Sequence, residues 1–473
     1  MIAPLLLSIC LLYFSFPNLF NSFGFWPLAW IFALPLFWIL DGQSWPRRLG
    51  IGFVFGLIFY ALLVKWLIPY HWAGYILFVA VLLIQPVLFC VFCRLPLNHK
   101  LDVLFVPALW VATEYIRAVL LKGFSWNLAH SQTFNIYGLQ TANLAGSWGI
   151  SFFIILVNYC LYRAIKDPAR RIHCIAIGLS AVLFMGSYGF LSIYLSPPSL
   201  EEVFNVCAVQ PNIDSREKRD PDLVPQHLAQ QAALSQHCLA KNKPDLIVWP
   251  ETAVSSDFQQ DPLLQKQMAS FTQDIGVPVL LGAALWKGDY NQNSAVLLNA
   301  GGLTGGIYYK QYLVPFSEKD FIAGPKASLF SLANHKFAVA ICSEDTIGSL
   351  FQGFSSQGAG FAVVLLNDGW FKEKAGLVMH GQNSIMRAAE NRMPIVRVAN
   401  TGWTALIDRY GQVKSMHEPW FNTTAIVSYE VSPYAERTLY SRIGDLFAVF
   451  CCLFVIIFQI VSLRFPFKSN GSS

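Results

Sequence analysis

Three chemically active side chains, Glu251, Lys310 and Cys342, stand at or just beyond the ends of apolar runs that are typical of buried strands. The runs are 245–249, 306–309 and 337–341. Ligands bind at strand ends in open α/β folds, so we expect the three side chains to share one site. A carboxylate, an ammonium and a thiol together make an activated nucleophile, with a base for the thiol and a cation for the developing oxyanion.

Each of these residues has an ordinary interpretation when it is taken alone. A cysteine after an apolar strand is commonly a buried structural thiol, and a lysine at a strand end is commonly solvated. Glu251 could be a carboxylate stabilised by the dipole at the start of a helix. The occurrence of all three, in this order, is what favours nucleophilic catalysis.

The surrounding segment alternates strand-like with helix-like stretches, which predicts a layered α/β domain with a hydrophobic sheet core. Gly301-Gly302 predicts a hairpin turn between two of the strands. The predicted strands are 202–209, 245–249, 277–282, 294–299, 306–310, 336–341, 361–366, 394–398, 404–408 and 424–429, and the predicted helices are 222–241, 259–273 and 376–391.

The chain as a whole is too apolar for an ordinary soluble enzyme. Of its 473 residues 55% are hydrophobic and 13% charged, and its mean hydropathy is +0.45. A membrane-spanning helix needs roughly 20 apolar residues. The sequence predicts eight spans, near 2–16, 24–40, 49–67, 73–93, 103–121, 147–163, 174–195 and 443–463. The first span lacks a basic start and a clear small-residue cleavage site, so we interpret it as an anchor rather than a signal peptide.

Charge divides the chain in the same way. Residues 1–200 carry a net charge of +7, whereas residues 201–445 carry −4, so the overall +5 comes from the membrane loops and is no evidence for nucleic-acid binding. With the N-terminus in the cytoplasm, the inside loops hold ten basic residues and the short outside loops hold two, which is a positive-inside bias. This predicts a helical bundle over 1–195, an extracytoplasmic catalytic domain over 196–442, and a last span with a cytoplasmic tail over 443–473.

The ten cysteines do not form a disulfide framework. Seven lie in or beside apolar spans, and Cys90-x-x-Cys93 is best explained there by packing rather than by redox or metal chemistry. The middle segment keeps Cys207, Cys238 and Cys342. Because three is an odd number, at least one is free or bonded to another chain, and Cys342 is the natural free thiol.

Longer motifs surround the three reactive residues, and at this point the middle segment resembles the carbon–nitrogen hydrolase (nitrilase) superfamily. The chain as a whole resembles the bacterial apolipoprotein N-acyltransferase family. The motifs that carry the resemblance are Glu114-Tyr115-Ile116-Arg117, Gly123-Phe124-Ser125-Trp126, Trp249-Pro250-Glu251-Thr252, Leu313-Val314-Pro315-Phe316-Ser317-Glu318, Cys342-Ser343-Glu344, Asn367-Asp368-Gly369-Trp370-Phe371, Met386-Arg387 with Glu390, and Asn400-Thr401-Gly402. The resemblance implies a nitrilase-like αββα sandwich inserted between transmembrane helices.

The resemblance also implies a role for each matching residue. Cys342 would be the nucleophile, Glu251 the general base, and Lys310 the oxyanion holder together with the backbone N–H of Ser343. Glu318 would be a second carboxylate that orients Lys310 or the incoming amine, with Glu344 in the same environment. Trp370 and Phe371 would line the entrance for an acyl chain, although core packing explains them as well.

The implied reaction transfers a fatty acyl chain from a membrane phospholipid, through a cysteine thioester, to the α-amine of a diacylated apolipoprotein. It implies a multi-pass protein of the bacterial cell inner membrane with its catalytic domain in the periplasm. No cofactor is implied. His71, His130 and His380 show no metal-binding pattern, so no metal site is expected.

Some positions depart from the family pattern. Ser343 stands where an aromatic residue is usual, Ser317 replaces a glycine, and Pro211 replaces the glycine of the family's Gln-Gly-Asn-Ile. A tryptophan expected shortly after Ile213 is missing. These changes leave the three reactive residues intact, but they leave the lipid preference open and allow a divergent paralogue with another acceptor.

Two other classes of function stay open. A membrane-anchored nitrilase-like amidase would pass the acyl group to water, and a catalytically inactive scaffold would bind lipid or lipoprotein without turnover. A thiol probe that labels Cys342 no faster than Cys207 would favour the scaffold.

Glu114 and Arg117 lie three apart within a span, where charges are usually paired; a structural ion pair explains them better than a lipid-headgroup site does.

Overall fold

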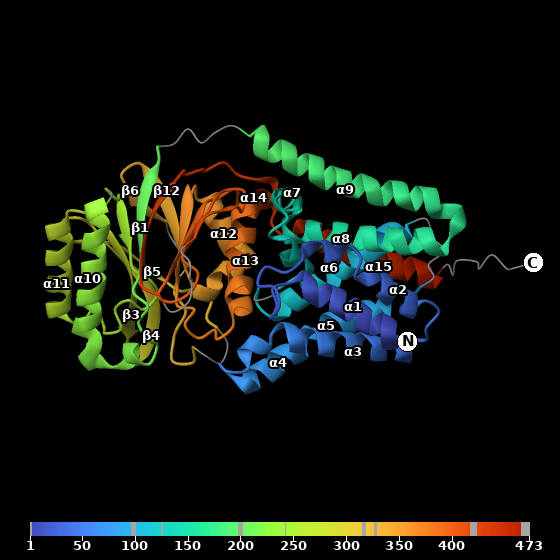
Figure 1. Ribbon diagram of the computed structural model, residues 1–473, viewed down its shortest axis with the longest axis horizontal. Coiled ribbons are helices and arrows are strands. Elements are labelled where there is room, and N and C mark those ends of the chain that lie inside the picture. Colours follow the sequence, from blue (N-terminus) through green and yellow to red (C-terminus); the bar gives the residue numbers. More distant parts are fainter. Residues whose placement is uncertain are drawn as a thin grey trace, which may run out of the picture. The chain divides into compact units, whose positions relative to one another are not determined.

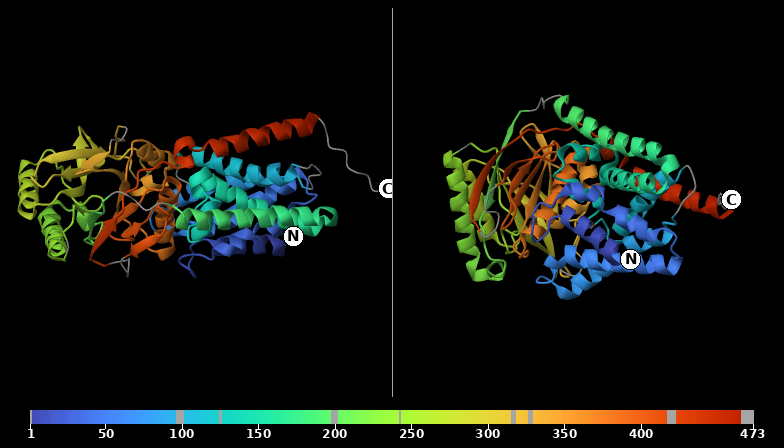
Figure 2. Two further views of the ribbon diagram at one scale, coloured as in Figure 1. Left: turned by 90° about the horizontal axis from the view of Figure 1, so that it is seen from above. Right: turned by 45° about the vertical axis from the view of Figure 1, so that its right-hand side comes forward.

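The computed structural model describes residues 2–95, 101–123, 126–196, 202–241, 243–314, 318–325, 329–416 and 423–464. The chain divides into two compact units. A helical unit contains Met1–Ser196, Glu373–Met379 and Arg442–Ser473, and an α/β unit contains Pro197–Lys372 and His380–Ser441. Figures 1 and 2 show the coiled ribbons of the first unit and the two sheets of the second.

The helical unit consists of apolar helices that run alongside one another (Figure 2). Its α-helices are α1 (Ile2–Ser15), α2 (Ala33–Leu40), α3 (Trp45–Leu63), α4 (Trp72–Leu82), α5 (Ile84–Phe92), α6 (Asp102–Leu120), α7 (Ile136–Leu139), α8 (Ala142–Lys166), α9 (Arg171–Tyr194) and α15 (Leu446–Arg464), with the short 3-10 helices η1 (Trp26–Trp30), η2 (Lys65–Leu67), η3 (Leu128–Gln132) and η4 (Pro168–Arg170).

Five stretches in the described residues are long and apolar enough to cross a membrane: Trp45–Leu63, Trp72–Phe92, Asp102–Leu120, Ala142–Lys166 and Pro168–Tyr194. They confirm five of the eight predicted spans. The other three form shorter apolar helices at Ile2–Ser15, Trp26–Leu40 and Leu446–Ser462. At about 1.5 Å per residue these are shorter than a hydrocarbon core of about 30 Å.

Glu114 and Arg117 of α6 are both buried, but they do not form the expected ion pair with each other. Arg117 donates hydrogen bonds to the Tyr60 hydroxyl and, at 2.6 Å, to the carbonyl oxygen of Trp126. One carboxylate oxygen of Glu114 accepts a hydrogen bond from the Leu128 N–H at 2.7 Å. The two charged side chains therefore anchor the connection that follows α6 rather than neutralise each other directly.

The α/β unit contains two six-stranded sheets, in the orders β12-β1-β2-β3-β4-β5 and β11-β10-β9-β8-β7-β6. β1–β2–β3 and β7–β8–β9 are the parallel cores of the two sheets, and the outer strands pair antiparallel. The strands are β1 (Phe204–Gln210), β2 (Leu246–Val248), β3 (Val279–Lys287), β4 (Tyr290–Leu298), β5 (Thr304–Tyr309), β6 (Phe330–Leu332), β7 (His335–Ile341), β8 (Phe361–Leu366), β9 (Ile395–Ala399), β10 (Ala405–Ile407), β11 (Val413–Met416) and β12 (Ala425–Val431).

Helices cover the outer faces of the two sheets, which gives the four layers of an αββα sandwich (Figure 1). α10 (Val224–Lys241) and α11 (Pro262–Ile275) pack on the first sheet, and α12 (Gly348–Ser356) and α13 (Lys374–Asn391) lie against the second. The central strands are buried on both sides, which explains their continuous apolar sequences. The remaining short helices are η5 (Glu217–Arg219), η6 (Pro221–Leu223), η7 (Cys342–Thr346) and α14 (Leu439–Ile443).

Polar contacts join the two sheets at the ends of β1 and β9. The amide of Asn400 donates to the carbonyl of Ile213 at 2.8 Å, and the Thr401 hydroxyl donates to the side-chain oxygen of Asn212 at 2.8 Å. The Thr404 hydroxyl donates to Gln210 at 2.6 Å. Asn400 and Thr401 of the predicted motif therefore join the two sheets whose other strands carry the reactive residues.

The predicted αββα class is confirmed, and all ten predicted strands and all three predicted helices are present. β6, β11 and α12 were not predicted. The segment 345–360 holds the end of η7 and all of α12, and the loop that begins at 369 ends at the start of α13 at Lys374.

Cys207 and Cys238 form a disulfide between β1 and α10, and Cys342 is a free thiol. The structure thus confirms Cys342 as the free cysteine among the three of the α/β unit. Both disulfide residues lie in the hydrophobic core between the first sheet and its helices. Because Cys207 is oxidised, it cannot serve as the reference thiol for labelling of Cys342.

The disulfide should contribute measurably to stability. Its two cysteines are separated by 31 residues, and closing a loop of this length lowers the entropy of the unfolded chain by an amount worth about 3 to 4 kcal/mol. We expect Cys207→Ala/Cys238→Ala to lower the melting temperature of the full-length protein in detergent, as measured by differential scanning fluorimetry. Cys342→Ala is the control and should leave the melting temperature close to that of the wild type. Equal melting temperatures for the double variant and the wild type would contradict the bond.

Candidate active site

Cys342 follows the last residue of β7 and begins the short helix η7. Its φ of 54° lies in the left-handed region, which non-glycine residues adopt rarely and mostly at functional sites. The turn lifts the thiol out of the line of the strand. It also leaves the first N–H groups of η7, including that of Ser343, at a helix start where intrahelical acceptors are lacking.

Glu344 holds this turn to the neighbouring strand end of the other sheet. Its carboxylate accepts hydrogen bonds from the N–H groups of Ile341 (2.8 Å), Gln311 (2.7 Å) and Tyr312 (3.1 Å), and from the Tyr308 hydroxyl at 2.7 Å. With both oxygens engaged by donors, Glu344 is built to fix the two segments relative to each other.

Glu251 lies just beyond β2, in a turn that the neighbouring strand β3 approaches closely. A Cβ at Gly282 of β3 would lie 2.4 Å from the Pro250 carbonyl oxygen, so only glycine permits this approach. The buried ammonium of Lys218 donates to the Glu251 carbonyl oxygen at 3.0 Å. Burial lowers the pKa of Lys218 to about 7, against the opposing effect of Glu251.

One amide bridges the two carboxylates of the site. Asn293 of β4 donates to Glu251 Oε1 at 2.8 Å and to Glu318 Oε1 at 3.4 Å. Glu318 also accepts from Lys310 Nζ at 2.9 Å and from the Val314 N–H at 2.7 Å. Lys310 is 1% exposed, so its ammonium depends on Glu318 for charge compensation.

The charges of the site act on one another's pKa values. Burial raises the pKa of the Glu251 carboxyl although Lys310 opposes the shift. The pKa of Lys310 is raised, because Glu318, Cys342 and Glu251 together outweigh its burial. Burial and the Glu251 charge raise the pKa of the Cys342 thiol well above its ordinary value. The resting site therefore holds a neutral thiol beside a carboxylate and a permanent ammonium.

The structure brings the residues singled out by sequence into one site. Glu251, Lys310, Glu318 and Cys342 are close enough to affect one another electrostatically, and the Lys310 charge acts on the carboxyl of Glu344 as well. Trp370 and Phe371 follow β8, where Trp370 is 36% exposed and the Phe371 ring contacts the His380 ring edge-on. Of the quoted motifs, Phe124-Ser125 and Pro315–Ser317 lie outside the described residues.

Sequence reasoning missed Asn293, Lys218 and the histidine beside Phe371. Asn293 lies inside a strand rather than at its end, so its position gave no signal. Lys218 stands in a charged segment, Arg216–Asp220, that is typical of a solvated loop, yet its side chain is buried. The predicted strand began at 294, whereas β4 begins at Tyr290, so Asn293 fell one residue outside the predicted element.

The sheet order and the meeting of carboxylate, ammonium and thiol define a carbon–nitrogen hydrolase domain. The carbon–nitrogen hydrolase family model matches residues 205–437, and the model of the apolipoprotein N-acyltransferase N-terminal domain matches residues 8–160. The chain belongs to the apolipoprotein N-acyltransferase family.

Full-length relatives carry the same assignment. The apolipoprotein N-acyltransferase of Geobacter metallireducens is 30% identical over 94% of this chain and 92% of its own, and apolipoprotein N-acyltransferase 1 of Treponema denticola is 26% identical over the same shares. Among solved structures, the NitN amidase of Neterenkonia sp. AN1 is 16% identical, with a TM-score of 0.42, over 50% of this chain and 95% of its own.

The raised pKa values predict how the reactivity of Cys342 depends on pH. The thiol is neutral near pH 7, so its alkylation needs Glu251 in the carboxylate form. Because the pKa of Glu251 is raised above 4.5, the carboxylate is lost as the pH falls through a value higher than that of an ordinary glutamate. We expect the rate of iodoacetamide alkylation of Cys342 to fall on this acidic limb, as followed by mass spectrometry.

Glu251→Gln is the matched variant for this pH dependence. It should abolish the acidic limb and leave only the slow rise that comes from direct ionisation of the thiol at alkaline pH. Identical acidic limbs in the two proteins would show that Glu251 is not the base for Cys342.

Proposed function

We propose that this protein transfers a fatty acyl chain from a membrane phospholipid to the α-amine of the N-terminal diacylglyceryl-cysteine of apolipoproteins, through a thioester on Cys342. The observation that carries the proposal is the convergence of Cys342, Glu251 and Lys310 in a chain that belongs throughout its length to the apolipoprotein N-acyltransferase family. The catalytic roles are assigned to these residues on their geometry and charge.

In the first half-reaction Cys342 Sγ attacks the ester carbonyl carbon of the phospholipid while the Glu251 carboxylate takes the thiol proton. The carbonyl π electrons move to oxygen, and the Lys310 ammonium with the Ser343 N–H stabilises this oxyanion. Collapse of the tetrahedral intermediate breaks the C–O bond. Glu251 gives its proton to the departing oxygen, which leaves a lysophospholipid and an acyl thioester.

In the second half-reaction the amine of the lipoprotein attacks the thioester carbonyl carbon. Glu251 accepts a proton from the attacking nitrogen, and the same oxyanion contacts stabilise the second tetrahedral intermediate. The C–S bond then breaks, the amide forms, and the proton returns to Cys342 Sγ. Asn293 and Glu318 are positioning residues in this scheme. Asn293 holds Glu251 in place and Glu318 holds Lys310, and neither forms or breaks a covalent bond.

The membrane helices support the proposal that the substrates are lipids, because the acyl donor and the acyl acceptor of this reaction are both embedded in a bilayer. We propose that the protein resides in the bacterial inner membrane with residues 196–442 on the periplasmic side. The distribution of basic residues supports this orientation. The disulfide between Cys207 and Cys238 supports it too, because disulfides persist in oxidising compartments.

A membrane-anchored amidase is the second candidate, because the α/β unit alone has the carbon–nitrogen hydrolase fold and water could replace the amine. What favours the transferase is the match of residues 8–160 to the N-terminal domain of the acyltransferase family, since an amidase of small substrates does not need that unit.

The decisive test is mass spectrometry of the purified full-length protein after mixing with phospholipid, and again after addition of a diacylated lipopeptide. We expect an acyl-sized mass gain on Cys342 that is then transferred to the peptide amine. Cys342→Ala should show neither event. Release of the acyl group to water alone would make the protein a lipid hydrolase, and no gain in a folded protein would favour an amidase or a scaffold.

The catalytic role of Lys310 can be tested separately from its structural role in the buried ion pair with Glu318. We expect Lys310→Met to slow formation of the acyl-enzyme by ~10²–10³-fold, since the oxyanion loses its charged partner. Lys319→Met, at an exposed position, is the control and should keep the wild-type rate. Lys310→Met/Glu318→Gln removes both charges of the pair, and its acyl-enzyme formation should stay as slow as in the single variant. A double variant with wild-type kinetics would limit Lys310 to balancing Glu318.

A further inference from the structure

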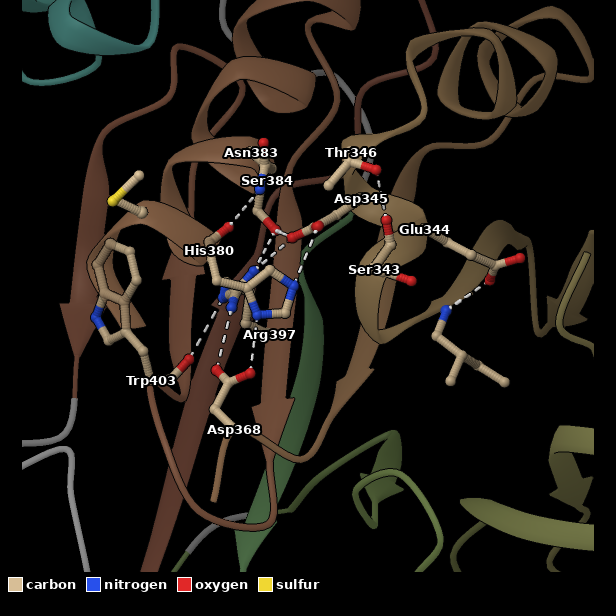
Figure 3. A network of polar contacts seen from close by, with 12 residues as sticks. Ser343, Glu344, Asp345, Thr346, Asp368, His380, Asn383, Ser384, Arg397 and Trp403 are labelled. Carbon is tan, nitrogen blue, oxygen red and sulfur yellow. Dashed lines mark hydrogen bonds and ion pairs between the residues drawn. The ribbon is translucent and has the colours of Figure 1, made fainter. Parts of the chain in front are cut away.

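A buried ionic network lies directly behind the turn that carries the nucleophile (Figure 3). Asp345, in η7, accepts hydrogen bonds from Arg397 Nη1 at 2.7 Å and from the Ser384 hydroxyl at 2.6 Å. Asp368, just after β8, lies 3.6 Å from Arg397 Nη2. His380 of α13 stands between the two carboxylates, and all five side chains are buried.

The two ring nitrogens of His380 each face a carboxylate oxygen. Nδ1 lies 2.8 Å from Asp368 Oδ1, and Nε2 lies 3.4 Å from Asp345 Oδ1. Ionised carboxylates only accept hydrogen bonds, and a neutral imidazole has one donor and one acceptor. The contact of Nδ1 with Asp368 is a hydrogen bond, and the contact of Nε2 with Asp345 is an ion-pair distance without a hydrogen bond. Both contacts are favourable together when the ring is an imidazolium, because each carboxylate then faces a protonated ring nitrogen.

The charge count agrees with this hydrogen-bond argument. Asp345 and Asp368 bring two negative charges, and Arg397 brings one positive charge. With a neutral His380 the network would bury one uncompensated negative charge, which is strongly unfavourable in a protein interior. With a charged His380 the network is neutral.

We infer that His380 is a permanently protonated positioning residue, which together with Arg397 neutralises Asp345 and Asp368 behind Cys342 and so keeps the nucleophile turn in place for acyl transfer. The inference deepens the proposed function and rests on it, although the protonation state can be tested without any substrate.

The position of the two carboxylates explains why the neutralisation matters. Asp345 lies in the same short helix as Cys342, so the contact with His380 ties that helix to α13. The negative charge of Asp368 is one of the causes of the raised pKa of the Cys342 thiol. During attack the sulfur gains negative charge, so an uncompensated Asp368 would oppose ionisation of the thiol.

The groups that face His380 hold it in the charged form. Burial would lower its pKa, but Asp368 and Asp345 outweigh burial and raise the pKa to about 10. Arg397 lies across the same carboxylates, and the Phe371 ring covers one edge of the imidazole. Because the pKa is raised, the charge is present throughout the neutral range and is lost only as the pH rises through about 10.

The test measures the rate of iodoacetamide alkylation of Cys342 in the full-length protein between about pH 6 and about pH 9, by peptide mass spectrometry. In His380→Gln the amide nitrogen can still donate a hydrogen bond to one carboxylate, but the side chain carries no charge. We expect alkylation at neutral pH to slow about tenfold, which corresponds to a rise of about one unit in the pKa of the thiol. His237→Gln, at an exposed histidine, is the matched control and should behave as the wild type.

The double variant His380→Gln/Asp345→Asn removes one charge of each sign, so the network is neutral again. We expect the double variant to regain most of the alkylation rate, and most of the melting temperature, that His380→Gln loses. A double variant that stays as impaired as His380→Gln, in alkylation or in folding, overturns the inference. So does a wild-type profile with a step near pH 6.5 that disappears in His380→Gln, because that histidine would titrate normally.

Failure of this inference can be told apart from failure of the proposed function. Alkylation reports on the thiol without phospholipid or lipopeptide. If the charge-balance result holds while phospholipid leaves no acyl group on Cys342, the proposed acyl transfer fails and the role of His380 stands. If acyl transfer is found but His380→Gln alkylates at the wild-type rate, only the role of His380 fails.

Discussion

The active site depends on a backbone conformation that an L-residue avoids. Cys342 has a left-handed φ, which costs on the order of 1–3 kcal/mol and persists only where the surroundings enforce it. Two acidic residues supply that enforcement from opposite sides. Glu344 binds the end of β5 through the N–H groups of Gln311 and Tyr312 and the Tyr308 hydroxyl, and it binds the end of β7 through the Ile341 N–H. Asp345 binds α13 and β9 through Ser384, His380 and Arg397. The consecutive acids after the nucleophile therefore join both sheets at the thiol.

A second constraint is the neutrality of what is buried around the thiol. Lys310 and Glu318 form one compensated pair, and a neutral amide, Asn293, separates Glu318 from Glu251. The network of Asp345, Asp368, His380 and Arg397 forms a second balanced group. Among the carboxylates, Glu251 has the largest effect on the pKa of the Cys342 thiol. Burial raises the pKa of the Glu251 carboxyl, so its carboxylate is a stronger base than that of an ordinary glutamate.

The residue pattern was sufficient to predict a layered α/β domain, the ten principal strands and the three strand-end residues, whereas the αββα class was implied by the family resemblance. Long apolar runs record burial on both faces directly, and buried parallel strands must place their following residues at a common edge. β6 and β11 were missed because each has only three or four residues and lies at the edge of its sheet, where alternation is too short to be read. α12 was missed because its sequence, Gly348–Ser356, is rich in glycine and serine and resembles a loop.

The supporting side chains were harder to predict than the catalytic ones, for a physical reason. A contact such as Asn293 with Glu251, or His380 with Asp345, joins residues more than 30 positions apart. Only the packing of strands and helices brings them together. His380 showed no metal-binding pattern, and its two acidic neighbours come from other elements, so its charge could not be inferred from local sequence. Lys218 was misjudged for the same reason. It stands in a charged run that is typical of a solvated loop, but in the fold its ammonium is buried against the carbonyl oxygen of Glu251.

The raised pKa of Cys342 also fits its coexistence with a disulfide in the same unit. Thiolates attack disulfides and are oxidised, whereas protonated thiols do so slowly. A nucleophile kept permanently as a thiolate would be exposed to both reactions, since Cys207 and Cys238 are oxidised in this protein. In the proposed mechanism the buried thiol loses its proton only to Glu251, as it attacks a carbonyl carbon, and is therefore protected between turnovers. Glu251 raises the pKa of the thiol and is also the proposed acceptor of its proton, so protection and activation would depend on the same residue.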